Sequence, residues 1–208
     1  MRILAMTLLG ILMPAAAGVS GPTAAGPAAR GNSPLKNPET LESGATLTTV
    51  NYAIPDVMLV RSDGKSVSLP DELNDGRPVV MSFIFTTCTT ICPLSSQTFQ
   101  KLQSMLGADR KRVHMVSISI DPEEDTPARL ATYAKGYKAG AGWSFYTGTV
   151  QAIIATQQAF GVYRGDKMNH TPVTLMRAAP GKPWIRIDGF ATADDLLRQV
   201  RSMSSASN

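Results

Sequence analysis

The sequence has few of the side chains on which enzyme chemistry depends. Its 208 residues include two cysteines and two histidines, and 17% of them are charged. The longest basic run, Arg110-Lys111-Arg112, is too short for a nucleic-acid footprint. Paired carboxylates, a Ser-His-Asp set and a glycine-rich phosphate loop are all missing at the spacing that each chemistry requires. We therefore expect no nucleic-acid partner and none of these three kinds of site.

Long apolar runs are also scarce, and the most extended one lies at the N-terminus. Arg2 precedes an apolar stretch over residues 3–13, and Ala15-Ala16-Ala17 follows it. This pattern is typical of secretory signals, so residues 1–17 are predicted to be a signal peptide cleaved after Ala17 or an uncleaved membrane anchor. No cysteine lies nearby, which argues against lipoprotein processing. We predict an exported, periplasmic protein, either soluble or anchored to the inner membrane by this segment.

Residues 18–47 contain no aromatic side chain, and Pro, Gly and Ala dominate them. Such a segment cannot bury enough apolar surface to offset the entropy lost on ordering, so it is predicted to be a flexible tether. The folded part is then residues 48–208, enough for one domain of ordinary size. The net charge of +4 is mild and indicates no particular partner.

Hydrophobic patterning indicates an α/β fold. Strands are predicted at residues 57–61, 66–69, 79–85, 113–120, 144–146, 171–177 and 183–187. Helices are predicted at residues 70–73, 93–106, 126–137, 151–160 and 192–203. Strands that alternate with helices around two buried apolar runs favour a central mixed β-sheet, with a β-hairpin added before it.

Both cysteines lie in one motif, Thr87-Cys88-Thr89-Thr90-Ile91-Cys92-Pro93, between a buried strand and a helix. Ligands bind at this end of strands in open α/β sheets. If Pro93 begins the helix, Cys92 lies at the helix N-terminus, where the dipole lowers a thiol pKa. A structural disulfide is the alternative, but so short a loop would add little stability. We favour chemistry at this pair, either redox or metal binding.

The two histidines have different surroundings. His114 lies inside a buried strand and is expected to be packed there. His170 precedes Thr171-Pro172, which looks like the loop where thioredoxin-like folds bring a cis-proline against the cysteine loop. There His170 would be within reach of both sulfurs; a surface-loop histidine is the alternative. Two thiolates and an imidazole suit copper and can also hold zinc.

One acidic segment ends at the same edge of the predicted sheet. Asp121 directly follows the strand over residues 113–120, so its carboxylate is expected near the cysteine loop. Asp121 and Asp125 either satisfy backbone donors around the turn and helix cap or orient the site from behind the ligands.

Several short motifs follow one another along residues 55–200. They are Gly64-Lys65, Arg77-Pro78, Thr87-Cys88-x-x-x-Cys92-Pro93, Ser119-Ile120-Asp121-Pro122-x-x-Asp125-Thr126-Pro127, Trp143, Thr147-Gly148 and His170-Thr171. Together they resemble the SCO/SenC family of copper-binding proteins across residues 55–200. The resemblance implies a thioredoxin-like three-layer fold and copper, as Cu(I) or Cu(II), bound by Cys88, Cys92 and His170.

The resemblance also implies that the protein acts on the dinuclear copper centre of cytochrome c oxidase, by delivering copper, by reducing its cysteines, or both. The partner is then the copper-bearing subunit of the oxidase or another periplasmic copper or thiol protein. Asn169 stands where the family usually has an acidic residue, directly before the ligand histidine. Such a residue supports the metal ligands without binding the metal itself. Thr89 and Thr90 stand where many members have an acid. These differences make the site less anionic and keep all three ligands.

Three functions stay open at this point. The first is an exported assembly factor that delivers copper to the oxidase or reduces the cysteines of its copper centre. The second is a periplasmic thiol–disulfide oxidoreductase in which Cys88 and Cys92 form the catalytic redox pair and metal binding is incidental. The third is a redox or copper sensor. The same two sulfurs serve all three, so a metallochaperone is favoured over an enzyme without excluding reductase activity.

Overall fold

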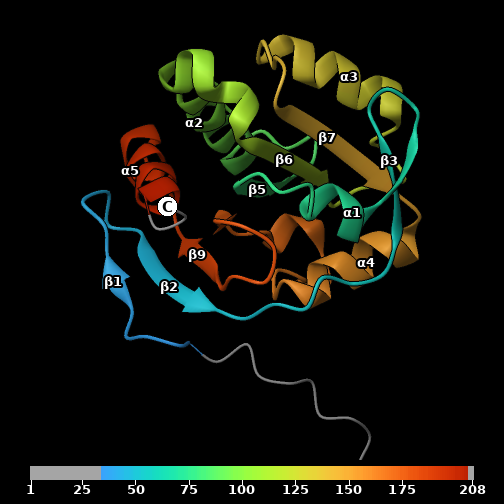
Figure 1. The fold of residues 1–208 in the computed structure, drawn as a ribbon. Coiled ribbons are helices and arrows are strands. Elements are labelled where there is room, and N and C mark those ends of the chain that lie inside the picture. The colour runs from blue at the N-terminus through green and yellow to red at the C-terminus, as the bar shows by residue number, and fades with distance from the viewer. Residues whose placement is uncertain (1–33, 206–208) are drawn as a thin grey trace, which may run out of the picture. The chain divides into compact units, whose positions relative to one another are not determined.

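The computed structural model describes residues 34–205 (Figure 1). The predicted signal segment, residues 1–17, and residues 18–33 of the predicted tether lie outside the described residues. Within the described part, no helix is both long and apolar enough to cross a membrane.

The described residues form a nine-stranded sheet and five α-helices. The strands are β1 (Glu39–Thr40), β2 (Thr46–Val50), β3 (Met58–Arg61), β4 (Ser66–Ser68), β5 (Val79–Ile84), β6 (His114–Ser119), β7 (Trp143–Gly148), β8 (Val173–Arg177) and β9 (Trp184–Asp188). The helices are α1 (Leu69–Leu73), α2 (Ile91–Leu106), α3 (Pro127–Gly136), α4 (Val150–Ala159) and α5 (Ala193–Ser205), with 3₁₀ helices η1 (Gly107–Arg112) and η2 (Lys167–Asn169).

The sheet is mixed, as predicted. Its strand order is β1-β2-β9-β8-β5-β6-β7-β3-β4. Strands β5, β6 and β7 run parallel, and the outer strands pair antiparallel. The predicted hairpins β3–β4 and β8–β9 are both present. Every residue of β5 and β6 is buried, including the polar residues Ser82, His114, Ser117 and Ser119, so neither strand has an exposed polar face.

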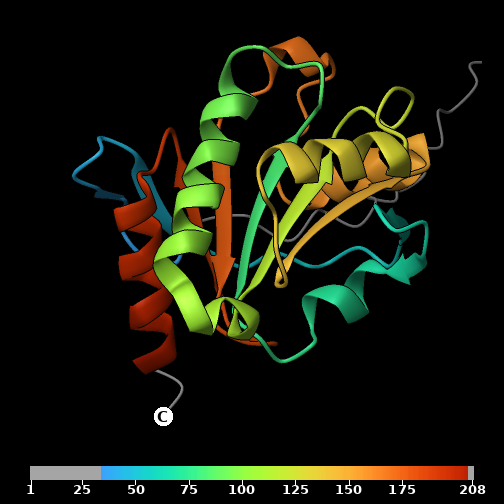
Figure 2. The same ribbon diagram turned by 90° about the horizontal axis from the view of Figure 1, so that it is seen from above.

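Helices cover both faces of the sheet and complete three layers. Helices α2, α3 and α5 lie across one face, as Figure 2 shows, and contribute Phe99, Leu130 and Leu196 to its core. Helices α1 and α4 contribute Leu73 and Ile153 to the core on the other face (Figure 1). The predicted three-layer α/β architecture is therefore confirmed.

The sheet begins earlier in the chain than the sequence indicated. Strand β2 pairs along its whole length with β9, from Thr46 opposite Asp188 to Val50 opposite Trp184. The segment is rich in threonine, a β-branched residue that favours strands once a partner is available. That partner is far away in the sequence, so the local pattern gave no sign of it.

Two further differences concern the segments around the cysteines and His170. Helix α2 begins at Ile91, with Thr90 as its N-cap, so Cys92 lies inside the first turn rather than at the cap. Pro93 is tolerated there because the first N–H groups of a helix have no partner within the helix. The described residues contain no cis peptide bond, so the cis form expected for Thr171-Pro172 is wrong.

Candidate functional site

Cys88 and Cys92 lie together at the carboxyl end of β5, where the chain enters α2. Both are free thiols and both are buried, with 9% and 1% of their surface exposed. The backbone N–H of Cys92 donates to Sγ of Cys88 at 3.4 Å. This N–H is available because it belongs to the first turn of α2 and has no partner in the helix. The first turn of α2 therefore provides a hydrogen bond to the sulfur of Cys88.

The two thiols have opposite pKa shifts. Burial tends to raise the pKa of Cys88, but hydrogen bonds from Cys92 and Thr90 outweigh it, so this pKa lies below its usual value. Burial raises the pKa of Cys92, and its hydrogen bond to Cys88 raises it further. The predicted thiolate at Cys92 is thus wrong, because Cys92 is buried within the first turn. The helix start favours the thiolate of Cys88 instead.

Asp125 connects the cysteine loop to the neighbouring strand. Its side chain is fully buried, with 0% exposure. One carboxylate oxygen accepts a hydrogen bond from the N–H of Thr86 at 3.0 Å and another from the hydroxyl of Ser119 at 2.6 Å. Thr86 follows β5, and Ser119 ends β6, so this carboxylate holds the base of the cysteine loop against the end of β6.

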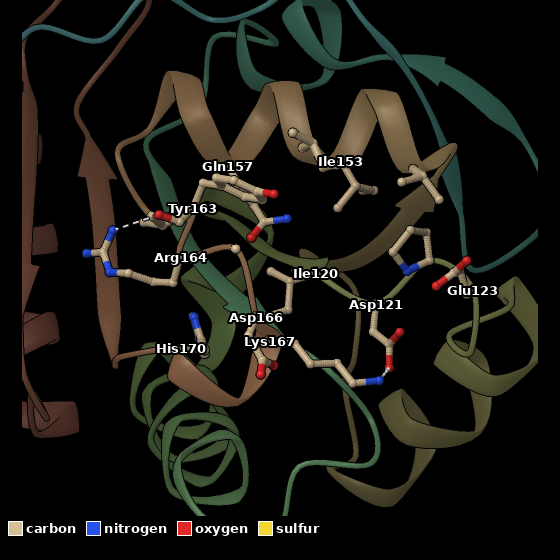
Figure 3. A pocket seen from close by; sticks show the side chains of 15 residues that line it. Ile120, Asp121, Glu123, Ile153, Gln157, Tyr163, Arg164, Asp166, Lys167 and His170 are labelled. Atoms are coloured by element: carbon tan, nitrogen blue, oxygen red, sulfur yellow. Dashed lines mark hydrogen bonds and ion pairs between the residues drawn. The ribbon is translucent and has the colours of Figure 1, made fainter.

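Asp121 lies at the same edge and contacts the segment that carries His170. Oδ2 of Asp121 accepts from Nζ of Lys167 at 2.6 Å, as the dashed line in Figure 3 shows. Lys167 begins η2, which ends at Asn169 directly before His170. Asn169 itself is exposed, and its backbone N–H donates to the carbonyl of Asp166. The ion pair of Asp121 therefore anchors the His170 segment to β6.

His170 is held at the end of β5. Its Nε2 lies 3.1 Å from the backbone carbonyl of Phe83. A carbonyl oxygen can only accept, so Nε2 carries the proton and the lone pair of the neutral ring is on Nδ1. Burial lowers the pKa of His170, which outweighs the opposite effect of the Phe83 carbonyl. The imidazole is therefore neutral at pH 7 and presents Nδ1 as a potential ligand.

The structure brings the two thiols together but does not join His170 to them in one cluster. Among residues 34–205, no group of three His, Cys, Asp or Glu side chains is close enough to hold a metal ion. His114, expected to be a packed histidine, is 1% exposed and lies at the opposite end of the sheet. There its ring contacts the carbonyl of Glu72 and the hydroxyl of Tyr146, away from the cysteines.

A sequence model of the SCO1/SenC family matches residues 49–205 of this chain. A SCO1 protein homolog of Bacillus subtilis is 38% identical over 166 residues, which are 75% of this chain and 85% of the relative. These matches span nearly all of the described fold.

Two solved structures resemble the chain as well. BsSco, reported with a disulfide switch as a Sco-family cytochrome c oxidase assembly protein, is 30% identical. The match has a TM-score of 0.63 and covers 76% of this chain and 96% of BsSco. Arabidopsis thaliana ScoI, solved with copper bound, is 25% identical at a TM-score of 0.58, with 74% of this chain and 99% of ScoI covered. The likeness confirms the predicted thioredoxin-like fold.

Proposed function

The chain belongs to the SCO1/SenC family, and from this premise we propose that it is a copper-binding assembly factor for cytochrome c oxidase. The observation that carries the proposal is the pair of free, adjacent thiols of Cys88 and Cys92 at the carboxyl end of β5. The copper is cargo, received and passed on. The acceptor is the copper-bearing subunit of the oxidase or another periplasmic copper or thiol protein.

The donor set suits copper. Thiolates are soft ligands that favour Cu(I), and the neutral imidazole of His170 offers Nδ1 as a third, borderline ligand. Because His170 does not lie in one cluster with the thiols, copper binding must bring its ring closer to Cys88 and Cys92. The hydrogen bond between His170 and the carbonyl of Phe83 then has to break or lengthen as the ring moves toward the copper.

The place of action follows from the N-terminal sequence. We propose that residues 1–17 export the chain or anchor it to the inner membrane, and that the residues after them tether the copper-binding domain in the periplasm. Copper binding by the thiols of Cys88 and Cys92 requires that they stay reduced in this compartment, so a reductant must act on the pair.

Thiol–disulfide exchange is the second candidate, favoured by the opposite pKa shifts of the two cysteines. The Cys88 thiolate attacks a disulfide of the acceptor, forms a mixed disulfide and releases one acceptor thiolate. Cys92 then loses its proton and attacks the sulfur of Cys88. This step releases the second acceptor thiol and leaves a Cys88–Cys92 disulfide, so two electrons pass to the acceptor.

Copper titration of the reduced protein tests the first candidate. We expect one equivalent of Cu(I) to bind, and His170→Ala to lower the affinity at least about tenfold, since a ligand is lost. Thr171→Ala, the exposed neighbour, is the matched control and should bind as the natural protein does. Competition with a Cu(I) chelator measures both. An unchanged Cu(I) affinity in His170→Ala would rule out His170 as the third ligand.

A second assay separates copper delivery from reduction. The metal-free, reduced protein is mixed with an oxidised dithiol acceptor, and acceptor thiols are counted over time. Reduction that proceeds equally well in His170→Ala favours the exchange reaction, because that reaction needs only Cys88 and Cys92. Transfer of bound copper to a reduced acceptor, lost in His170→Ala, favours delivery.

A further inference from the structure

A cavity of about 330 Å³ lies beside His170 and contains neither cysteine in its wall. It is bounded by α4, by the residues that follow β6 and by the segment over residues 162–170 (Figure 3). This volume is within the range that small-molecule sites occupy. Its wall combines buried apolar side chains with polar groups, as binding cavities do.

The polar group that points to a ligand is Gln157. Its side chain is 7% exposed, and its amide has no hydrogen-bond partner among residues 34–205. Figure 3 shows that amide directed from α4 into the cavity. Because this amide has both a donor and an acceptor, its natural complement is another amide, such as a peptide group, which can donate to Oε1 and accept from Nε2.

The apolar part of the wall lies on the same helix. Ile153, one turn before Gln157, is 1% exposed and lines the cavity, and Val162 on the facing segment is 3% exposed. An amide that binds Gln157 therefore has an apolar surface next to it. A small aliphatic side chain adjacent to the bound peptide group fits this surface.

Opposite charges stand at the two ends of the cavity. Arg164 and Glu123 both line it and lie on opposite sides of the view in Figure 3. Nη1 of Arg164 donates to the carbonyls of Gly161 and Tyr163, and no carboxylate pairs with this guanidinium in the described part of the chain. Glu123 likewise has no ion pair there. Lys167 cannot substitute for Arg164, because Asp121 already neutralises it.

We propose that this cavity binds a short extended peptide. Its carboxylate faces Arg164, its peptide group pairs with Gln157, an aliphatic side chain packs on Ile153, and its ammonium group faces Glu123. The proposal rests on the cavity alone and is independent of copper. Because His170 also lines the cavity, the bound peptide contacts the loop of the proposed copper ligand from a side that the thiols do not occupy.

The tetrapeptide glycyl-leucyl-glycyl-glycine is the probe, since it carries all four groups in this order and is about 14 Å long when extended. It is titrated into the full-length, ¹⁵N-labelled protein while NMR follows the side-chain amide of Gln157 and, in every variant, the backbone amides of Ile153 and Val162 in the cavity wall. We expect a saturable shift of these resonances. Gln157→Leu should weaken binding about tenfold, as for loss of one buried hydrogen-bonded pair, while the melting temperature stays the same or rises. Gln158→Leu, exposed on the same helix, is the matched control and should not change binding.

A blocked analogue, N-acetyl-glycyl-leucyl-glycyl-glycinamide, separates the two sources of such a ligand. Equal binding of the blocked form indicates a segment within a partner protein. Binding only with free termini, weakened by Arg164→Gln, indicates a free short peptide. A Gln157 resonance that never shifts saturably overturns the proposal, and so does unchanged binding in Gln157→Leu.

Discussion

The two cysteines differ in their burial and in their hydrogen bonds. The N–H of Cys92 donates to Cys88, and Thr90 Oγ1 lies 3.8 Å from the same sulfur. Cys92 is itself 1% exposed, which penalises its thiolate. The thiolate is therefore favoured at Cys88 over Cys92, and the position of the first turn of α2 sets this difference.

Alkylation kinetics test this asymmetry in the reduced, metal-free protein. Cys88 should react faster than Cys92 with iodoacetamide, because only the thiolate reacts and only Cys88 has a lowered pKa. The rate should stay high below the usual pKa of a thiol and fall at lower pH as Cys88 takes up its proton. Peptide mass spectrometry after short exposures measures each site. Equal rates at the two cysteines would contradict the assignment.

Asp125 is the residue that holds the cysteine loop in place. Asp125→Asn removes acceptor capacity facing Thr86 and Ser119, so we expect the free energy of unfolding to fall by about 1–3 kcal/mol. Glu123→Gln, exposed on the same loop, is the control and should change it by less than about 0.5 kcal/mol. Urea denaturation measures both. A loss no larger than the control's would mean that Asp125 does not support the loop.

Among the elements, α1 depends on a buried polar contact with the sheet. Nδ1 of His114, in the first position of β6, lies 3.1 Å from the carbonyl of Glu72 in α1. Tyr146 from β7 donates to the carboxylate of the same Glu72, and its hydroxyl also lies 3.3 Å from Nε2 of His114. A five-residue helix makes few contacts of its own, so these bonds position it.

Stability should therefore fall in mild acid. Burial lowers the pKa of His114, with Arg77 acting in the same direction, so the unfolded chain binds a proton more readily than the folded one. The contribution is complete above the unfolded value of about 6.5 and is lost as the pH falls below it. The thermal midpoint should drop in that range. In His114→Gln the thermal midpoint should fall less with decreasing pH. The fall that remains is partly due to His170, whose pKa is also lowered. An unchanged pH profile in His114→Gln would refute this role.

For the molecule as a whole, β2 covers an edge of the sheet that would otherwise be open. Its five residues pair with the five residues of β9. An uncovered strand edge presents unpaired N–H and C=O groups that bind other chains. The segment before the predicted domain therefore has a structural task beyond tethering.

Truncation tests this task. A chain that begins at residue 51 lacks β1 and β2, so we expect it to self-associate more strongly than a chain that begins at residue 34. Sedimentation velocity over a range of protein concentrations compares the two. If both chains sediment alike and unfold at the same temperature, β2 is dispensable for the edge.

Local patterns in the sequence were sufficient for most elements and for the cysteine pair. The apolar run Val79–Ile84 indicated a strand buried on both faces, and Thr126-Pro127 indicated the start of α3, because burial and capping act over a few residues. The Cys88–Cys92 motif lies between a buried strand and a helix, as its sequence indicated. Strand β2 was not predicted, because its partner β9 follows more than a hundred residues later.

The tertiary structure decided the surroundings of the individual groups at the candidate site. That Cys88 rather than Cys92 favours the thiolate depends on where α2 begins and on the burial of Cys92. The contact of His170 with Phe83 joins residues that are 87 positions apart. A pKa or a ligand orientation is set by neighbours in space, and such neighbours follow from how the strands and helices pack and not from the residues adjacent in the chain.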